Sequence, residues 1–272
     1  IHGSVMTLLS IIIKKLLIPV IIAVLSRQLS PADFGLAAMV LVVTAFLTLF
    51  SDMGFPLATI QKAQVDQRQI SAMFWLNLLL GGLLTLLLCA AAPLVVRFYH
   101  QPMLVPVTRW CSLTFFLTAL GAQHGALLQR RMHFSALTLV ETISTTLGGT
   151  VGIIMALYGG GVYALVAQLL VEQFSASLLK WLFSRWLPGR PATLAEIRSM
   201  IQLGGYFTLY SVIMYFTRQL DRLLIGRGWG DTALGLYQRA YSLMLYPIDL
   251  VSLPLSRVGL PLLSKLQHQP ER

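Results

Sequence analysis

About eight long hydrophobic stretches occupy most of this 272-residue chain, and each is long enough to cross a lipid bilayer. A helix needs about 20 apolar residues to cross a hydrocarbon core about 30 Å thick. Only 11% of the residues are charged, whereas a soluble domain carries about 25%. The stretches are apolar on all sides and do not alternate, so helices are favoured over barrel strands. The predicted fold class is an all-α polytopic membrane protein.

Short segments with turn or capping residues separate the hydrophobic stretches. Ser30, Pro31 and Asp33 are typical of a helix start with an N-cap, a proline at the first position and an acid at the third. The glycines at 159–161 predict a tight turn between two spans. The predicted spans are residues 4–26, 35–57, 70–96, 110–128, 134–157, 162–183, 200–225 and 237–262.

The longest polar connection predicts a boundary between two helical bundles. It contains the turn-forming run Pro188-Gly189-Arg190-Pro191. We therefore expect a first six-helix transmembrane lobe at residues 1–184, a cytoplasmic connection at 185–199, and the first two helices of a second lobe at 200–272.

Lysine and arginine are distributed unevenly between the connections, which predicts the orientation in the membrane. Connections after even-numbered spans carry most of them, and those after odd-numbered spans carry only four arginines. We expect the even-numbered connections and the N-terminus to be cytoplasmic. This bias explains most of the net charge of +10, so the composition indicates no nucleic-acid partner. The residues of the basic side are Lys62, Arg68, Arg130, Arg131, Arg185, Arg190, Arg198, Lys265 and Arg272.

The chain contains a weak internal repeat. Residues 27–36 resemble residues 227–236, with an arginine at the start and Gly-Leu at the end of both, and residues 54–57 resemble 259–262. Six predicted spans separate equivalent points, and six is even, so the two units share an orientation. Such parallel repeats are related by an axis along the membrane normal, as in transporters built of two similar halves.

Ionisable residues within the predicted spans are the candidates for a functional site, because charge is costly in a membrane. Lys14 lies near the middle of the first span, on one helical face with Thr7 and Ser10. It either faces a cavity or extends its side chain to the interface.

Two carboxylates lie on polar stripes of the fifth and sixth spans. Glu141 shares its stripe with threonines and a glycine, and Glu172 shares its stripe with Gln168 and Ser175. They could line a water-filled path, bind a cation or pair with Lys14. The alternative is a structural hydrogen-bond network between two closely packed helices.

The seventh span ends with a charged group of three residues. Arg218 and Arg222 share a helical face, and Asp221 can pair with Arg218 three positions earlier. An ion pair at the membrane interface is the alternative to a cavity. Embedded cations favour an anionic substrate such as a phosphate or an acidic sugar, because buried charge is tolerated best when it is paired.

Motifs of soluble enzymes are absent from the sequence. It contains no phosphate-binding glycine loop with a lysine, no metal-ligand cluster and no nucleophile elbow. His124, beside Gln123, either faces a cavity or, as we expect, is a packed histidine with satisfied nitrogens. We therefore predict a protein that is not an enzyme, with no bound cofactor, and leave H⁺ or Na⁺ open as a coupling ion.

Several segments, taken in order, resemble a known family. The chain is similar to the polysaccharide flippases of the multidrug/oligosaccharidyl-lipid/polysaccharide exporter superfamily, and most similar to the lipopolysaccharide-biosynthesis branch that includes the colanic acid exporters. The resemblance covers essentially the whole chain. The segments that carry it are residues 29–42, 50–61, 74–84, 97–102, 120–141 and 220–247.

The resemblance implies a function. Members move an undecaprenyl-diphosphate-linked oligosaccharide across the bacterial inner membrane by alternating access between two six-helix lobes, and polymerases and other polysaccharide-assembly proteins are expected partners. Lys14 stands where relatives often carry an arginine, and Arg218 and Asp221 fall in a matching segment. Because relatives usually continue further, we expect one whole lobe and part of a second. The alternatives are a cation-coupled multidrug exporter and a non-transporting scaffold of a polysaccharide-assembly complex.

Overall fold

The computed structural model describes residues 17–51, 56, 59–60, 65–193, 209–210, 212–217 and 219–245. Within these residues every regular element is a helix, which confirms the predicted all-α membrane fold. Five of the described helices are long enough and apolar enough to cross a membrane. They are α2 (Pro31–Ser51), α4 (Gln67–Tyr99), α5 (Leu104–Arg130), α6 (Phe134–Leu157) and α7 (Val162–Ser184). A shorter apolar helix, Leu17–Gln28, precedes them.

The helices begin where capping residues satisfy their first backbone groups. The side chain of Asp33 accepts hydrogen bonds from the Ser30 amide (3.0 Å) and hydroxyl (2.7 Å), and the Ser30 hydroxyl accepts one from the Asp33 amide (3.2 Å). This capping box confirms the start of α2 predicted from the sequence. Asp66 and Gln69 form a second capping box at the start of α4, so that helix begins before its apolar run does.

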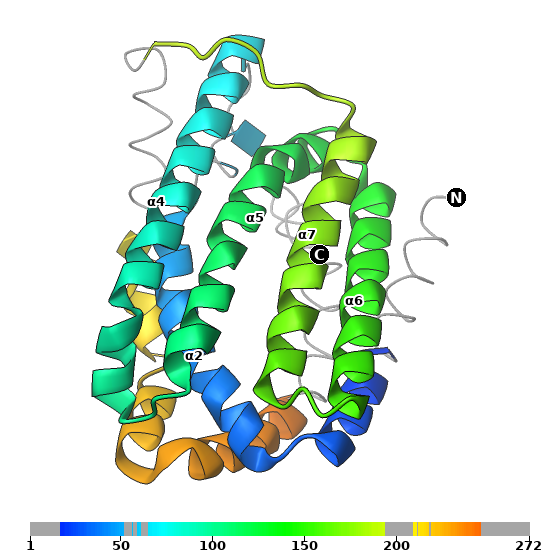
Figure 1. Ribbon diagram of the computed structural model, residues 1–272. Helices are drawn as coiled ribbons and strands as arrows, with labels where there is room; N and C mark the ends of the chain where they lie inside the picture. The colour runs from blue at the N-terminus through cyan, green and yellow to red at the C-terminus, as the bar shows by residue number, and fades with distance from the viewer. Residues whose placement is uncertain are drawn as a thin grey trace, which may run out of the picture.

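Helices α2, α4, α5, α6 and α7 form a bundle in which neighbours along the chain run antiparallel (Figure 1). The α4–α5 and α6–α7 turns lie at one end, called here the lower end, and the α5–α6 turn lies at the upper end. The most extensive contacts are those of α4 with α5, α6 with α7, and α5 with α7. Small residues permit the close approach: a Cβ on Gly81 would lie 2.8 Å from the Phe115 carbonyl oxygen of α5.

An aromatic cluster fills the upper part of the bundle. The ring of Phe74 on α4 lies 5.9 Å from that of Trp181 on α7 and 6.0 Å from that of Trp186, measured between centroids. The ring of His124 on α5 contacts all three, and its centroid lies 4.2 Å from that of Trp181. The rings meet edge-on or tilted, which are favourable aromatic geometries, so the cluster fixes α4, α5 and α7 against one another.

Residues 185–193, called here the strap, leave α7 and cross the upper end to the start of α4 (Figure 1). Backbone and side-chain hydrogen bonds hold the strap along its length. The predicted polar connection is therefore tied to α4. The bonds run from Trp186 Nε1 to Gln67 Oε1 (2.6 Å), Gln67 Nε2 to the Leu187 oxygen (3.1 Å), Trp75 Nε1 to the Gly189 oxygen (3.1 Å), the Gly189 amide to Ser71 Oγ (3.0 Å), and the Ala192 amide to the Arg68 oxygen (3.0 Å).

Residues 219–245, called here the C-terminal segment, cross the lower end of the bundle (Figure 1). The sequence predicts a non-helical connection at 226–236, and this prediction is wrong because these residues are helical. Gly230 has a φ of 82°, a value that glycine adopts without strain, so the chain changes direction there while helix continues on both sides. Leu234 is completely buried in the same core as Leu36, Met39 and Tyr99 of the bundle.

Candidate functional site

The five ionisable residues singled out in the sequence fall into three places. Lys14 and Arg218 lie outside the described residues. Glu141 is exposed on α6, Glu172 is half-buried on α7, and Asp221 belongs to the C-terminal segment. The two glutamates therefore belong to the bundle, and Asp221 belongs to a separate group of polar side chains.

Glu172 takes part in the contact between α6 and α7. Its Oε1 accepts a hydrogen bond of 2.8 Å from the Thr145 hydroxyl. Beside it, a Cβ on Gly148 would lie 2.7 Å from the Gln168 carbonyl oxygen, so the two backbones approach closely. A threonine, a carboxylate and a glycine at one helix crossing are the arrangement expected of an interhelical network.

We expect replacement of Thr145 by valine to destabilise the protein by about 1 kcal/mol, because it removes the hydroxyl that satisfies Glu172 while keeping the shape of the side chain. The measurement is the free energy of unfolding in mixed micelles, by titration with SDS. Thr146→Val is the matched control, since the exposed Thr146 hydroxyl bonds to a carbonyl of its own helix. Equal effects of the two substitutions would contradict a role for the Thr145–Glu172 bond.

Glu141 interacts electrostatically with Lys180 of α7. The Lys180 side chain packs beside Gly125 of α5, where a Cβ would lie 3.6 Å from the lysine Cδ. The sequence pattern does not single out Lys180, because it lies near the end of its span, where a lysine can reach the membrane interface. The signal that points to it is the antiparallel pairing of the fifth and sixth spans, which brings the start of one beside the end of the other.

His124 is completely buried in the aromatic cluster, and both ring nitrogens lack a hydrogen-bond partner among the described residues. Its packed position agrees with the expectation from the sequence. The expectation that its ring nitrogens would be hydrogen-bonded is not met among the described residues. Trp181, whose ring is tilted by 37° to the imidazole, donates its own Nε1–H to the Leu120 carbonyl (2.7 Å). The indole is thus fixed by a backbone contact beside the imidazole.

Asp221 is held by two donors of the C-terminal segment. Its Oδ2 accepts a hydrogen bond of 2.5 Å from the Tyr237 hydroxyl, and its Oδ1 accepts one of 2.8 Å from the Arg222 amide. Tyr237 also stacks on Tyr241, with ring centroids 5.8 Å apart. The carboxylate therefore joins the helical turns before and after Gly230.

Arg222 completes this group, called here the arginine–tyrosine cluster (Asp221, Arg222, Tyr237 and Tyr241), and a second arginine of the same segment, Arg239, contacts α2. The Arg222 guanidinium lies 5.1 Å from the centroid of the Tyr241 ring, and that of Arg239 lies 3.3 Å from the centroid of Phe34 on α2. The Nε of each arginine is buried without a hydrogen-bond partner in the part of the chain that the structure describes. Each guanidinium thus has one donor that no described residue satisfies.

The arrangement is suited to binding an anion. A guanidinium has donors in a planar fork that matches the geometry of phosphate and carboxylate, and it stacks on aromatic rings. The sequence pattern points to Asp221 and Arg222 but not to their partners. Tyr237 and Tyr241 lie 15 or more positions further on, and the change of direction at Gly230 brings Tyr237 to the carboxylate.

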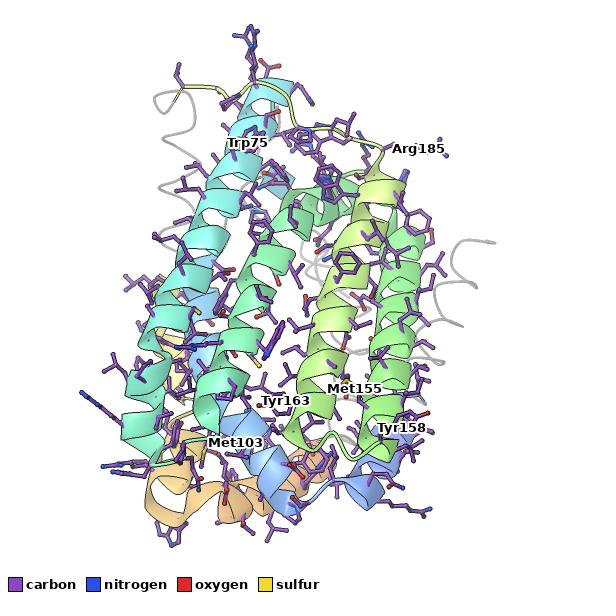
Figure 2. All side chains as sticks on the ribbon, in the orientation of Figure 1. Trp75, Met103, Met155, Tyr158, Tyr163 and Arg185 are labelled. Carbon is purple, nitrogen blue, oxygen red and sulfur yellow. The ribbon has the colours of Figure 1, made fainter. Side chains whose placement is uncertain are left out.

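Figure 2 shows the side chains of the bundle in the same orientation. Tyr163 of α7 and Met155 of α6 lie near the lower end, and Trp75 and Arg185 lie at the upper end beside the strap. Many large apolar side chains point outward from the helices, including Leu79 (66% exposed), Leu86 (70%) and Leu182 (63%). Such an outer surface is the one expected of helices that contact lipid.

Known proteins similar to this chain act in the synthesis of bacterial polysaccharides. The teichuronic acid biosynthesis protein TuaB of Bacillus subtilis (strain 168) is 29% identical over 83% of this chain and 47% of its own length. The lipopolysaccharide biosynthesis protein WzxC of Escherichia coli (strain K12) is 27% identical over 92% of this chain and 51% of its own. The succinoglycan biosynthesis transport protein ExoT of Rhizobium meliloti (strain 1021) is 26% identical over 93% and 51%.

The chain spans about half the length of these curated relatives, as the shares of 47% and 51% indicate. No solved structure matches it. The resemblance to polysaccharide exporters that the sequence segments indicate is confirmed by the names of the relatives. The profile of the family described as "Polysaccharide biosynthesis protein" matches residues 24–272, so the chain belongs to that family of multi-pass membrane proteins.

Proposed function

We propose that this chain is part of a flippase that moves oligosaccharide repeats linked to undecaprenyl diphosphate across the bacterial inner membrane by alternating access. The observation that carries the proposal is the family match over residues 24–272, combined with five apolar helices that can cross a membrane. One protein similar to this chain, ExoT, is named as a transport protein. In this proposal the chain performs no chemistry on its substrate and is not an enzyme.

The arginine–tyrosine cluster supports an anionic substrate. Arg222 of this cluster has a buried donor that no described residue satisfies and stacks on Tyr241. Arg239 of the same segment also has such a donor and stacks on Phe34. A diphosphate or an acidic sugar supplies the matching acceptors. Lys14 and Arg218 remain proposed contributors to binding of the same substrate, and Asp221 accepts hydrogen bonds from two donors of the C-terminal segment.

The glutamates are proposed to have a structural role. A multidrug exporter for cations would need carboxylates that are available to its substrate, whereas Glu172 accepts the Thr145 hydrogen bond and Glu141 interacts with Lys180. We also propose that the N-terminus is cytoplasmic and that the transporter has two six-helix lobes, the first of which is residues 1–184. Transport would be coupled to H⁺ or Na⁺, and the partners would include polymerases of polysaccharide assembly.

Genetic complementation tests the proposal. The chain, and separately the chain extended by the remaining helices of a relative such as WzxC, would be expressed in a strain that lacks its exopolysaccharide flippase. Surface polysaccharide and the lipid-linked repeat retained at the cytoplasmic face would then be measured. Restored export by either form supports a flippase, and failure of both at normal membrane levels would argue for the drug-exporter or scaffold alternative.

In the form that restores export, we expect Arg222→Gln or Arg239→Gln to lower export about 10- to 100-fold, since a charge-assisted hydrogen bond to an anion contributes about 1.5–3 kcal/mol. Arg190→Gln is the matched control, because Arg190 is exposed on the strap. Export that survives both arginine substitutions unchanged would remove the two arginines from the substrate path.

A further inference from the structure

The two repeated segments of the sequence pack directly against each other at the lower end. A Cβ built on Gly35 of α2 would overlap the backbone oxygen of Asp231 and lie 2.8 Å from the Asp231 Cα. A Cβ built on Gly235 would overlap the backbone oxygen of Pro31 and lie 3.0 Å from the Gly35 amide nitrogen. Backbone therefore touches backbone at both positions, and only glycine leaves room for this contact.

The two contacts join equivalent positions of the repeat in a reciprocal way. Asp231 is the equivalent of Pro31 (231 − 31 = 200), and Gly235 is the equivalent of Gly35 (235 − 35 = 200). Gly35 thus contacts the equivalent of Pro31, while Pro31 contacts the equivalent of Gly35. Reciprocal pairs of this kind are the mark of an interface with twofold symmetry.

Further contacts extend the interface on both sides of the glycine pair. A Cβ on Gly226 would lie 2.9 Å from the Tyr99 ring, and Leu234 is completely buried. The Arg227 guanidinium bonds to the carbonyl of Phe98 and lies 2.5 Å from the His100 Nδ1. The C-terminal segment is therefore seated on the ends of α2 and α4.

We propose that these repeated segments, residues 27–36 and 227–236, form a pseudo-twofold joint that closes the lower end of the path between the two halves of the transporter, and that Gly35 and Gly235 are the residues that permit closure. The contact between the segments is independent of the substrate. Its assignment as the closed end of a transport path rests on the proposed function, and the positive-inside bias places this end on the periplasmic side.

The physical reason is the distance between the two backbones. Glycine at an interface lets helices approach until their backbones touch, as small residues do in membrane helix pairs. A methyl group at either position would hold the segments apart and admit water to Leu234 and to the core that it shares with α2 and α4. One added methyl group would thus convert a closed joint into an open one.

Accessibility of a cysteine in the joint tests this inference. The parent is the full chain with Cys89→Ala, Cys111→Ala and Leu234→Cys, in membranes, treated with a water-soluble maleimide. We expect slow labelling in the parent and labelling at least about tenfold faster after Gly35→Ala or Gly235→Ala, because a buried thiol must become exposed to react. Gly82→Ala and Gly228→Ala are the controls, since a Cβ at either has no atom within 4 Å.

A cross-link measures the same joint without burying a thiol. Phe34→Cys and Arg239→Cys replace two side chains in direct contact across the joint. Their oxidative cross-linking, read by mass spectrometry of the linked peptides, should fall several-fold after Gly35→Ala or Gly235→Ala. A second pair at the upper end, Gln67→Cys with Trp186→Cys, should cross-link equally in all variants if each is folded.

Fast labelling of Leu234→Cys in the parent would contradict the proposed joint. The proposal would also be contradicted if neither glycine substitution changed the labelling rate or the cross-linking. The two glycine variants are independent, so if one misfolds, the other still tests the joint. Neither measurement depends on transport. A chain that forms the joint but never restores export would contradict the proposed function and leave the pseudo-twofold contact standing.

Discussion

Replacement of Phe74 by alanine is expected to destabilise the protein by about 3–5 kcal/mol, the usual cost of truncating a buried aromatic residue. Phe74 is 2% exposed and stands at the centre of the aromatic cluster, with its ring near those of Trp75, His124, Trp181 and Trp186. Its loss leaves a cavity where α4, α5, α7 and the strap meet, and the surrounding rings lose their packing partners.

The measurement is the free energy of unfolding in mixed micelles, with tryptophan fluorescence as the signal, since Trp181 and Trp186 report on the cluster itself. Leu79→Ala is the control on the same helix, because Leu79 is 66% exposed and faces away from the bundle. We expect its effect to stay within about 0.5 kcal/mol. Similar effects of the two substitutions would mean that the aromatic cluster does not hold the upper end together.

The second large effect is expected at the crossing of α6 and α7. Gly148→Val should destabilise the protein by about 1–3 kcal/mol through overpacking. The Cβ of the new side chain would lie 2.7 Å from the Gln168 carbonyl oxygen and 2.9 Å from the Glu172 Cβ. Both are closer than real contacts allow, and neither neighbour is the free end of a flexible side chain, so the helices must move apart.

Gly82→Val is the matched control for this substitution. Gly82 also lies within a membrane-spanning helix, α4, but a Cβ there would meet no atom within 4 Å. Both variants carry the same change of helix propensity, and their difference in unfolding free energy isolates the contact between α6 and α7. If the two were equally stable, the close approach at Gly148 would be contradicted.

Much of the fold follows from the sequence because the bilayer restricts it so strongly. Apolar length predicts helices, and the predicted span 134–157 coincides with α6 while 162–183 ends one residue before α7 does. The ends of α4 and α5 could not be predicted as well. Their first turns contain polar or proline residues, and capping by Asp66 rather than hydropathy decides where α4 begins.

The candidate site was less predictable, because it depends on contacts between distant residues. The change of direction at Gly230 brings Tyr237 to Asp221, and a glycine in a predicted connection does not specify it. The internal repeat predicts equivalent segments with a common orientation. That these segments would touch, with Gly35 on Asp231 and Gly235 on Pro31, follows only from how the helices pack.

The strap has a consequence for the order in which the protein is made. Every hydrogen-bond partner that holds it belongs to residues synthesised earlier, in the first turns of α4. Once residue 193 has left the ribosome, the aromatic cluster has all of its members, including Trp186. Since chains fold from the N-terminus as they emerge, the nascent bundle can complete its upper end before the C-terminal segment exists. That segment then docks onto a surface that is already formed.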